Sequence, residues 1–297
     1  MTDERRTGDP GAAPPAPARL VVEGATIRYD RAVVCEGLSV RIPTGSFTAV
    51  IGPNGCGKST LLRALARVLT PASGRVLLDG RAIDAYRSKE IARRLGLLPQ
   101  TSSAPDGIRV ADLVSRGRAP HQGLFHQWRH EDEEAVAAAM RATGVSDLSG
   151  RLVDELSGGQ RQRVWVAMLL AQRTPILLLD EPTTFLDIAH QYELMELFRT
   201  FHDEGNTVVA VLHDLNQAAR YADHLVVMRE GAVVTTGSPR EVVTAELVEE
   251  VFGLRCLVVP DPVTGTPAVV PLDPRSTPPT PTGTSRTGGA PGARAQK

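Results

Sequence analysis

One eight-residue segment restricts the possible folds of this 297-residue chain more than any other. It matches the pattern GxxxxGK[ST] and reads Gly52, Pro53, Asn54, Gly55, Cys56, Gly57, Lys58 and Ser59. It follows an apolar run that favours a strand, and Thr60 then opens a run typical of a helix. Glycines let successive backbone N–H groups turn toward an anion, and a helix N-terminus adds positive potential. The segment therefore predicts a phosphate-binding loop, in which Lys58 reaches the β- and γ-phosphates and the Ser59 hydroxyl binds Mg²⁺.

Two acidic residues follow a second apolar run. Residues 176–179 are Ile-Leu-Leu-Leu, and Asp180 and Glu181 come directly after them. The carboxyl edge of a parallel sheet is where α/β proteins bind their ligands. We expect Asp180 to hold Mg²⁺ through a water molecule, and Glu181 to orient the attacking water or accept its proton. Without the phosphate-binding loop, a helix N-cap would explain such a pair equally well.

The chain divides into a folded centre and two polar ends. Residues 1–18 and 273–297 are rich in Pro, Gly, Ser, Thr and Ala, and they are predicted to be disordered tails because they bury too little apolar surface. Between them strand-like and helix-like runs alternate, which predicts an α/β domain with a mostly parallel sheet covered on both faces. We place this domain at 19–260, with a helical subdomain at about 101–155 and a β extension at 261–272.

Individual elements are predicted from the period of the apolar residues. The predicted strands cover 21–29, 33–42, 47–51, 176–179, 207–212 and 225–228, and a hairpin turn is expected at Glu230–Gly231. The predicted helices cover 58–68, 110–116, 131–142, 161–172, 188–202 and 215–221.

Composition excludes several function classes. Lys and Arg number 33 against 34 Asp and Glu, and this net charge of −1 lacks the basic excess of nucleic-acid-binding proteins, so no nucleic-acid partner is expected. Three cysteines without a repeating spacing indicate neither a disulfide framework nor a zinc site, and they fit a reduced cytosol. No apolar run approaches the roughly 20 residues of a membrane-spanning helix, and no signal-peptide core is seen.

A third motif, Leu156-Ser157-Gly158-Gly159-Gln160, distinguishes among proteins with a phosphate-binding loop. The Ser157 hydroxyl and the N–H groups of the two glycines, with a helix directly behind them, make a second anion site. A Ser-Gly-Gly turn is also a good helix cap, so a structural role for the motif stays open as the alternative interpretation. Placed one helix upstream of the Asp-Glu strand, the motif resembles the signature of ABC-type ATPases. The resemblance covers about 19–260 and implies the ABC ATPase fold, with an antiparallel β subdomain and a helical subdomain.

The resemblance also assigns roles to single residues. It implies that Tyr29 stacks on the adenine of ATP, that Gln100 senses Mg²⁺, that Asp187 lies in a loop crossing a dimer interface and that His213 contacts the γ-phosphate. Glu181, His213 and Gln100 would be catalytic, Mg²⁺ would be held by Ser59, Gln100 and Asp180, and ATP would be bound by Tyr29 and the loop from Gly52 to Thr60. Two copies would meet head to tail, so that residues Ser157, Gly158, Gly159 and Gln160 of one copy close the ATP of the other.

A finer resemblance concerns the transported cargo. Segments 116–121, 181–191 and 212–220 resemble the ATPases of iron–siderophore importers, relatives of the vitamin B12 and haem systems. This implies a peripheral protein at the cytoplasmic face of the cell membrane, with an integral-membrane permease docked on 101–118 and a substrate-binding protein acting indirectly. Cobalamin, haem and manganese stay open as cargo, because cargo does not touch the ATPase. A soluble ABC ATPase acting on ribosomes or DNA is a further alternative, whereas a GTPase switch lacks its Asn-Lys-x-Asp motif.

Two smaller features have competing explanations. Cys56 sits at a helix N-terminus, where the pKa of a thiol tends to fall, but a small side chain that fits a crowded turn is the favoured explanation. His121, His126 and His130 lie near Glu131 and Glu134, but their mixed spacing on loops makes a poor metal site, and a solvated polar face is the favoured reading.

Overall fold

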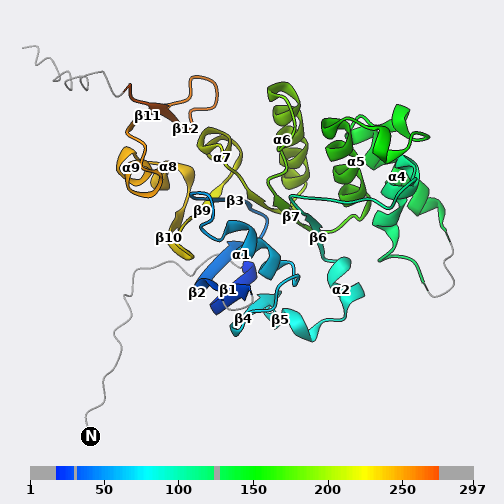
Figure 1. Ribbon diagram of the computed structural model, residues 1–297, viewed down its shortest axis with the longest axis horizontal. Helices are drawn as coiled ribbons and strands as arrows, with labels where there is room; N and C mark the ends of the chain where they lie inside the picture. Colours follow the sequence, from blue (N-terminus) through cyan, green and yellow to red (C-terminus); the bar gives the residue numbers. More distant parts are fainter. Residues whose placement is uncertain (1–17, 30–31, 124–127, 274–297) are drawn as a thin grey trace, which may run out of the picture.

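A six-stranded sheet forms the centre of the computed structural model, which describes residues 18–29, 32–123 and 128–273. The tails predicted at 1–18 and 273–297 fall outside this range except for Ala18 and Asp273. Five strands run parallel, and β10 closes one edge in the antiparallel direction (Figure 1). The strand order is β10 (Ala232–Gly237), β9 (His224–Arg229), β3 (Phe47–Ile51), β8 (Thr207–Val211), β7 (Ile176–Asp180) and β6 (Leu95–Leu98).

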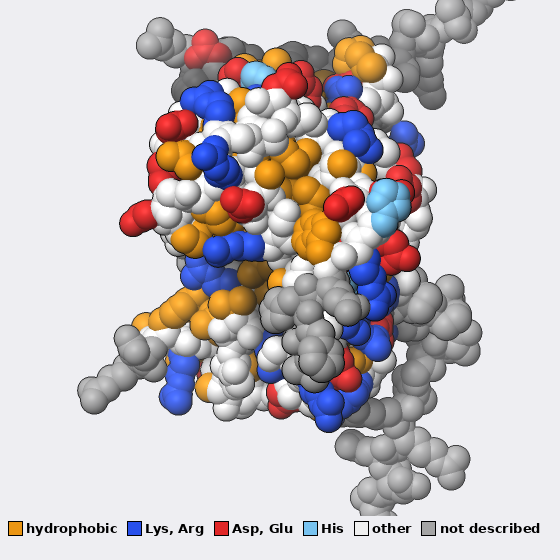
Figure 2. Space-filling view, turned by 90° about the vertical axis from the view of Figure 1, so that its right-hand side faces the viewer, with side chains coloured by type: hydrophobic (Ala, Val, Ile, Leu, Met, Phe, Trp, Pro, Cys, Tyr) orange, Lys and Arg blue, Asp and Glu red, His pale blue; other side chains and the backbone are white. Residues whose placement is uncertain are grey.

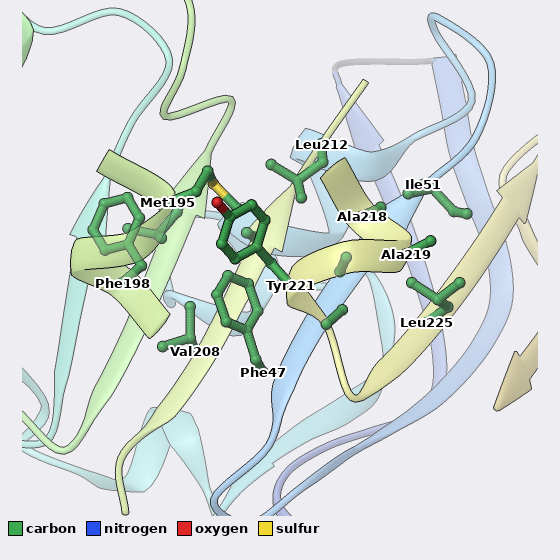
Figure 3. Packing of buried hydrophobic residues seen from close by; sticks show 14 of the residues in the cluster. Phe47, Ile51, Met195, Phe198, Val208, Leu212, Ala218, Ala219, Tyr221 and Leu225 are labelled. Carbon is green, nitrogen blue, oxygen red and sulfur yellow. The ribbon is translucent and has the colours of Figure 1, made fainter. Parts of the chain in front are cut away.

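Both faces of this sheet are apolar because helices or strands cover each of them. On β3, Phe47 and Ile51 point into one hydrophobic cluster and Val50 into the other, as expected from the alternation of side chains along a strand. Figure 3 shows the first cluster, where Phe47 and Val208 of the sheet lie against side chains of α6 (Ile188–Asp203) and α7 (Leu215–Tyr221). The prediction of a parallel sheet covered on both faces is therefore confirmed.

The antiparallel subdomain covers the other face. Its strand order is β2 (Ala32–Pro43), β1 (Ala18–Tyr29), β4 (Ser73–Leu78) and β5 (Arg81–Ala82), and it packs with α1 (Lys58–Leu65) on the second cluster. The apolar pattern of the sequence does not predict β4, β5, β6 or the short helix α2 (Ser88–Ala92). The predicted helix 58–68 is too long, because Arg67 adopts a left-handed conformation (φ 57°) and ends the helical turn.

The helical subdomain has a hydrophobic core of its own. It contains α3 (Val110–Ser115), α4 (His130–Ala142) and α5 (Gly158–Ala171), and α5 lies beyond the predicted limit of about 155. A buried ion pair joins its parts, since Arg118 Nε donates to Asp132 Oδ1 at 2.8 Å and Arg118 Nη1 donates to the Ala171 carbonyl at 2.9 Å. On this side of the molecule hydrophobic side chains gather in the middle of the face, with charged side chains around them (Figure 2).

The last part of the chain packs against α7. The hairpin predicted at Glu230–Gly231 is confirmed between β9 and β10. Two short helices follow, α8 (Pro239–Val242) and α9 (Ala245–Phe252), and then the antiparallel pair β11 (Cys256–Pro260) and β12 (Pro267–Pro271). This pair starts at Cys256, so its first strand belongs with the β extension predicted at 261–272. Within the described ranges, every helix falls short of the length and apolarity needed to cross a bilayer.

Candidate functional site

The loop from Gly52 to Gly57 joins the end of β3 to the start of α1. Gly52 has φ 152°, and a Cβ there would lie 2.1 Å from the Met228 carbonyl oxygen, so only glycine fits. The Lys58 ammonium, which is buried, donates to the carbonyls of Gly52 at 2.8 Å and Pro53 at 2.9 Å. The first N–H groups of α1 have no acceptor within the helix and point out of its N-terminus. This loop is therefore built to bind an anion.

Asp180 lies beside the N-terminus of α1. The Ser59 hydroxyl donates to Asp180 Oδ1 at 2.7 Å, whereas the buried Oδ2 has no hydrogen-bond partner among the described residues. Burial raises the pKa of Asp180 and outweighs the opposing hydrogen bond from Ser59. An unpartnered carboxylate oxygen next to a hydroxyl is a suitable oxygen donor set for Mg²⁺, directly or through water. The residues present therefore fit the cation that the sequence predicts.

Glu181 lies next to Asp180 and is held by two other predicted site residues. Gln100 Nε2 donates to Glu181 Oε2 at 2.8 Å, and His213 Nε2 lies 2.6 Å from Glu181 Oε1. The three residues follow β6, β7 and β8, which are neighbours in the sheet, so their carboxyl ends meet at one edge.

A cleft of about 580 Å³ opens in front of these residues. It is lined by Val34, Asn54, Gly55, Gly57, Lys58, Ser59, Thr60, Gln100, Glu181 and His213. The structure thus brings nine of the predicted site residues to a single cleft, among them the three that are predicted to be catalytic.

Tyr29 ends β1 beside the cleft, although it is not one of the residues that line it. Its ring is half-exposed, and Arg63 of α1 donates to its hydroxyl at 3.2 Å. This contact places the ring next to the helix that starts at the phosphate-binding loop. Sequence reasoning did not single out Arg63.

The signature motif lies on a different part of the molecule. Ser157 caps α5, because its hydroxyl accepts from the N–H of Gln160 and the Gln160 side chain accepts from the N–H of Ser157, both at 3.2 Å. The motif therefore does form a helix cap, and the second anion site stays a prediction. A Cβ on Gly158 would lie 3.6 Å from Phe185 Cβ, and one on Gly159 would lie 3.2 Å from Leu186 Cδ2, so both glycines pack against the loop after Glu181. Among the described residues that line the cleft, none comes from the signature.

Asp187 caps the next helix. Its carboxylate accepts from the N–H of His190 at 3.0 Å and lies 2.7 Å from His190 Nδ1. These contacts, the backbone N–H first, hold the pKa of the exposed Asp187 carboxyl below its usual value. Asp187 is likewise outside the cleft.

The lowered thiol pKa considered for Cys56 and the solvated position favoured for His121 are wrong, whereas the favoured explanation of Cys56 as a small side chain in a crowded turn is not contradicted. The pKa of the Cys56 thiol is raised, because burial outweighs the charge of Lys58 and the nearby N–H groups. His121 is not on a solvated face: its Nε2 lies 2.7 Å from the Gln172 carbonyl in a partly buried position. His130 does lie on an exposed surface, next to Glu133 and Glu134, and His126 is outside the described residues.

Three glutamines that sequence reasoning did not assign hold the loops of the site. Gln162 of α5 donates to the Pro182 carbonyl at 2.9 Å, directly after Glu181. Gln191 of α6 donates to the Leu186 carbonyl at 3.0 Å, and Gln217 of α7 donates to Gln191 Oε1 at 3.0 Å. The available signal was that Gln191 and Gln217 stand in two of the segments that carry the finer family resemblance.

A phosphate-binding loop at the end of a central parallel strand, with a carboxylate pair at the end of a nearby strand, defines a P-loop nucleoside triphosphatase. Comparison with known proteins is more specific, since residues 35–184 match the ABC transporter family. The ferric enterobactin transport ATP-binding protein FepC of Escherichia coli (strain K12) is 60% identical over 256 residues, which cover 86% of this chain and 94% of that protein.

Two further relatives agree. YusV of Bacillus subtilis (strain 168), a probable siderophore transport system ATP-binding protein, is 52% identical over 85% of this chain and 92% of that protein. A solved inward-facing structure of a putative metal-chelate type ABC transporter superposes with a TM-score of 0.72 at 28% identity, covering 86% of this chain and 98% of that chain. The chain belongs to the ABC transporter family, as an ATP-hydrolysing subunit. The fold class and the family predicted from the sequence are therefore confirmed.

Proposed function

We propose that this ATPase energises the import of a ferric siderophore through a separate membrane permease. The observation that carries this proposal is the 60% identity with a ferric enterobactin transport ATP-binding protein along nearly the whole length of that protein. Haem is the alternative cargo, because hemin import ATP-binding proteins such as HmuV of Pseudomonas fluorescens (strain Pf0-1) are 43% identical. Cobalamin is a weaker alternative that rests on the sequence resemblance alone, and another metal chelate is one that rests also on the likeness to the solved metal-chelate type transporter.

The geometry of the cleft supports a role for each side chain in ATP hydrolysis. Lys58 and the N–H groups of the phosphate-binding loop bind the phosphates, and Tyr29 stacks on the adenine. Ser59, Asp180 and Gln100 would hold Mg²⁺, which would neutralise charge that develops on the phosphates. Glu181 accepts the proton of the attacking water, and His213, at 2.6 Å from Glu181, donates toward the γ-phosphate.

Hydrolysis requires a second copy in this proposal. The signature residues Ser157–Gln160 and the loop residue Asp187 lie outside the cleft of their own chain, so they act on the cleft of the other copy. Two large apolar side chains next to them, Phe185 and Ile188, are 76% and 75% exposed, which fits a surface that a second copy covers. A head-to-tail dimer would bring the signature of each copy to the ATP of the other and exclude water from both sites.

Replacement of Glu181 by Gln tests the hydrolytic role. The amide keeps an oxygen acceptor for Gln100 but cannot accept a proton, so we expect kcat to fall about 10²- to 10⁴-fold while ATP still binds. ATP binding and phosphate release are measured together with the mass of the particle by light scattering, and the variant should accumulate as a dimer with ATP. Glu131→Gln, on the exposed surface of α4, is the matched control. Near wild-type turnover of the Glu181 variant would contradict the assignment.

The permease contact is proposed on the segment that follows Gln100. Residues 101–107 are mostly exposed and form neither helix nor strand, so their surface is open to a partner, and 110–118 continue into the helical subdomain. The chain would therefore act at the cytoplasmic face of the membrane as a peripheral subunit, with a substrate-binding protein contacting only the permease. No nucleic-acid partner is proposed.

Uptake in cells tests the cargo. A strain that lacks this chain is given ferric catecholate siderophore, hemin or cobalamin, and radioactive iron or cobalt is counted in washed cells. We expect the strain to lose uptake of the ferric siderophore and to keep uptake of hemin and cobalamin. Siderophore uptake should return when the wild-type chain is supplied but not when the Lys58→Ala variant is supplied. Loss of hemin uptake instead would favour the alternative. Co-purification with ribosomes or DNA, rather than with a polytopic permease in detergent, would contradict an import role.

A further inference from the structure

Two amide side chains connect the loop after Glu181 to the helix after His213. Gln217 Nε2 donates to Gln191 Oε1 at 3.0 Å, and Gln191 Nε2 donates to the Leu186 carbonyl at 3.0 Å. A carbonyl can only accept, so Gln191 must present its NH₂ to Leu186 and its oxygen to Gln217. We call these two hydrogen bonds the glutamine relay. Its direction, from Gln217 through Gln191 to the Leu186 carbonyl, is therefore fixed. Gln217 is buried, at 5% exposed.

One end of the relay holds a loop that is costly to form. The loop from Glu181 to Asp187 contains two non-glycine residues with positive φ, Glu181 at 52° and Phe185 at 68°. Such conformations persist only when the surrounding structure holds them. Gln162 holds the loop at the Pro182 carbonyl, near its beginning, and Gln191 holds it at the Leu186 carbonyl, near its end. Loss of either hydrogen bond would let that part of the loop relax.

The other end of the relay is attached to the segment that carries His213. Asp214 caps α7, because its carboxylate accepts from the N–H groups of Asn216 at 2.7 Å and Gln217 at 3.0 Å. Asn216 fixes the outer side of α7 to β12, since its Oδ1 accepts from the N–H of Val269 at 2.7 Å. His213, Asp214 and Gln217 therefore belong to one braced segment.

The segments 181–187 and 213–217 are thus joined at two points. The first is the contact between His213 and Glu181 at the cleft, and the second is the glutamine relay, whose residues do not line the cleft. If α7 moved together with His213, the two hydrogen bonds of the relay would connect that movement to the Leu186 carbonyl.

We propose that Gln191 and Gln217 are positioning residues that keep the loop from Glu181 to Asp187 in register with His213. The relay passes contact between His213 and the γ-phosphate on to Phe185 and Asp187, the part of the loop that faces the second copy. This inference rests on the proposed ATP-dependent dimer. It also gives a physical reason for the glutamines in the segments 181–191 and 212–220, which neither bind nucleotide nor line the cleft.

Three variants test the relay: Gln217→Leu, Gln191→Leu and the double variant. Each breaks the relay and leaves the cleft-lining residues in place, so we expect kcat for ATP hydrolysis to fall about 3- to 30-fold, with KM for ATP within about twofold of wild type. Because the relay acts as a unit, the double variant should be no slower than the slower single variant.

Stability separates positioning from a general structural role. Gln191→Leu leaves the buried amide of Gln217 without its acceptor, so its urea midpoint should fall, and the double variant should recover it because the orphan donor is gone. The double variant is therefore expected to be stable but still slow. Asn206→Ala, which removes a comparable bond to the Phe201 carbonyl at 2.9 Å far from the cleft, is the control that should keep wild-type kcat.

The outcomes discriminate between the relay and the proposed dimer. The relay would be overturned if Gln217→Leu kept the wild-type kcat, or if the effects of the two single variants on kcat added up in the double variant. It would also be overturned if kcat of the double variant recovered together with its urea midpoint. A wild-type protein whose specific activity does not rise with its own concentration would instead overturn the dimer on which the relay acts.

Discussion

Replacement of Arg118 by Met would remove one partner of the buried ion pair in the helical subdomain. Arg118 and Asp132 are 5% and 4% exposed, and Arg118 also donates to the Ala171 carbonyl. Methionine fills much of the space of the arginine stem but leaves the Asp132 carboxylate without its cation and the Ala171 carbonyl without the arginine donor. Breaking a buried pair in this way costs about 3–5 kcal/mol. Because Asp132 Oδ2 still accepts from the N–H of Arg129 at 3.2 Å, we expect a value near the lower limit.

The two tryptophans of the chain make the measurement specific. Trp165 of α5 packs against the core of the helical subdomain and against that of the central sheet, and Trp128 stands just before α4. Tryptophan fluorescence in urea therefore reports on unfolding of the subdomain and on loss of its contact with the sheet. With a slope of about 1–3 kcal/mol/M, the expected loss lowers the midpoint by about 1–3 M. The double variant Arg118→Met, Asp132→Leu removes the unpaired charge and should regain most of the loss, apart from the cap that Asp132 provides at the start of α4.

The dependence on pH gives the argument a second test. Burial opposes ionisation of Asp132, but the hydrogen bond and charge of Arg118 outweigh it and hold its pKa below the usual value. The pair therefore stabilises the wild type above the unfolded pKa of about 3.9, and this contribution is lost as the pH falls through the lower folded pKa. In the Arg118→Met variant, protonation of Asp132 removes the unpaired charge. The difference in free energy of unfolding between wild type and variant should therefore become smaller from pH 7 to pH 4. A variant that loses less than about 1 kcal/mol of unfolding free energy at pH 7, or a difference from wild type that grows as the pH falls, would refute this reasoning.

Three further outcomes follow from the site. Ser59→Ala removes the hydroxyl that donates to Asp180. The rate of ATP hydrolysis should fall at least about tenfold, and a metal titration should show that more Mg²⁺ is required. An unchanged Mg²⁺ dependence would show that Ser59 is not part of the metal site. Gly231→Ala places a Cβ 2.1 Å from the Val34 carbonyl oxygen at φ 80°, so its free energy of unfolding should fall by more than about 1 kcal/mol in urea; a smaller loss would show that the hairpin shifts freely. Cys56 should react with iodoacetamide at pH 7 more slowly than a free thiol, because burial raises its pKa, and the labelled protein should lose ATP binding; full ATPase activity after stoichiometric labelling would contradict this.

Different parts of the candidate site were open to prediction from the sequence to different degrees. The phosphate-binding loop was predictable because its glycines, Lys58 and Ser59 lie in one short segment that ends where α1 starts, whereas the close approach of Met228 to Gly52 is a tertiary contact. The Ser157 cap is equally local. By contrast, β4 to β6 were missed because their short apolar runs carry no clear period, and α1 was extended too far because nothing local showed that Arg67 would turn left-handed.

The amino-acid sequence alone determined the parallel α/β class, the phosphate-binding loop, the acidic pair and the family, because each is encoded in residues close together along the chain. Only the tertiary structure decided which distant side chains meet. Gln100 and His213 reach Glu181 because β6, β7 and β8 are neighbours in the sheet, an order that no local pattern states. The raised pKa of Cys56 and the relay from Gln217 to Leu186 have the same origin, since burial and side-chain pairing depend on how separate segments pack.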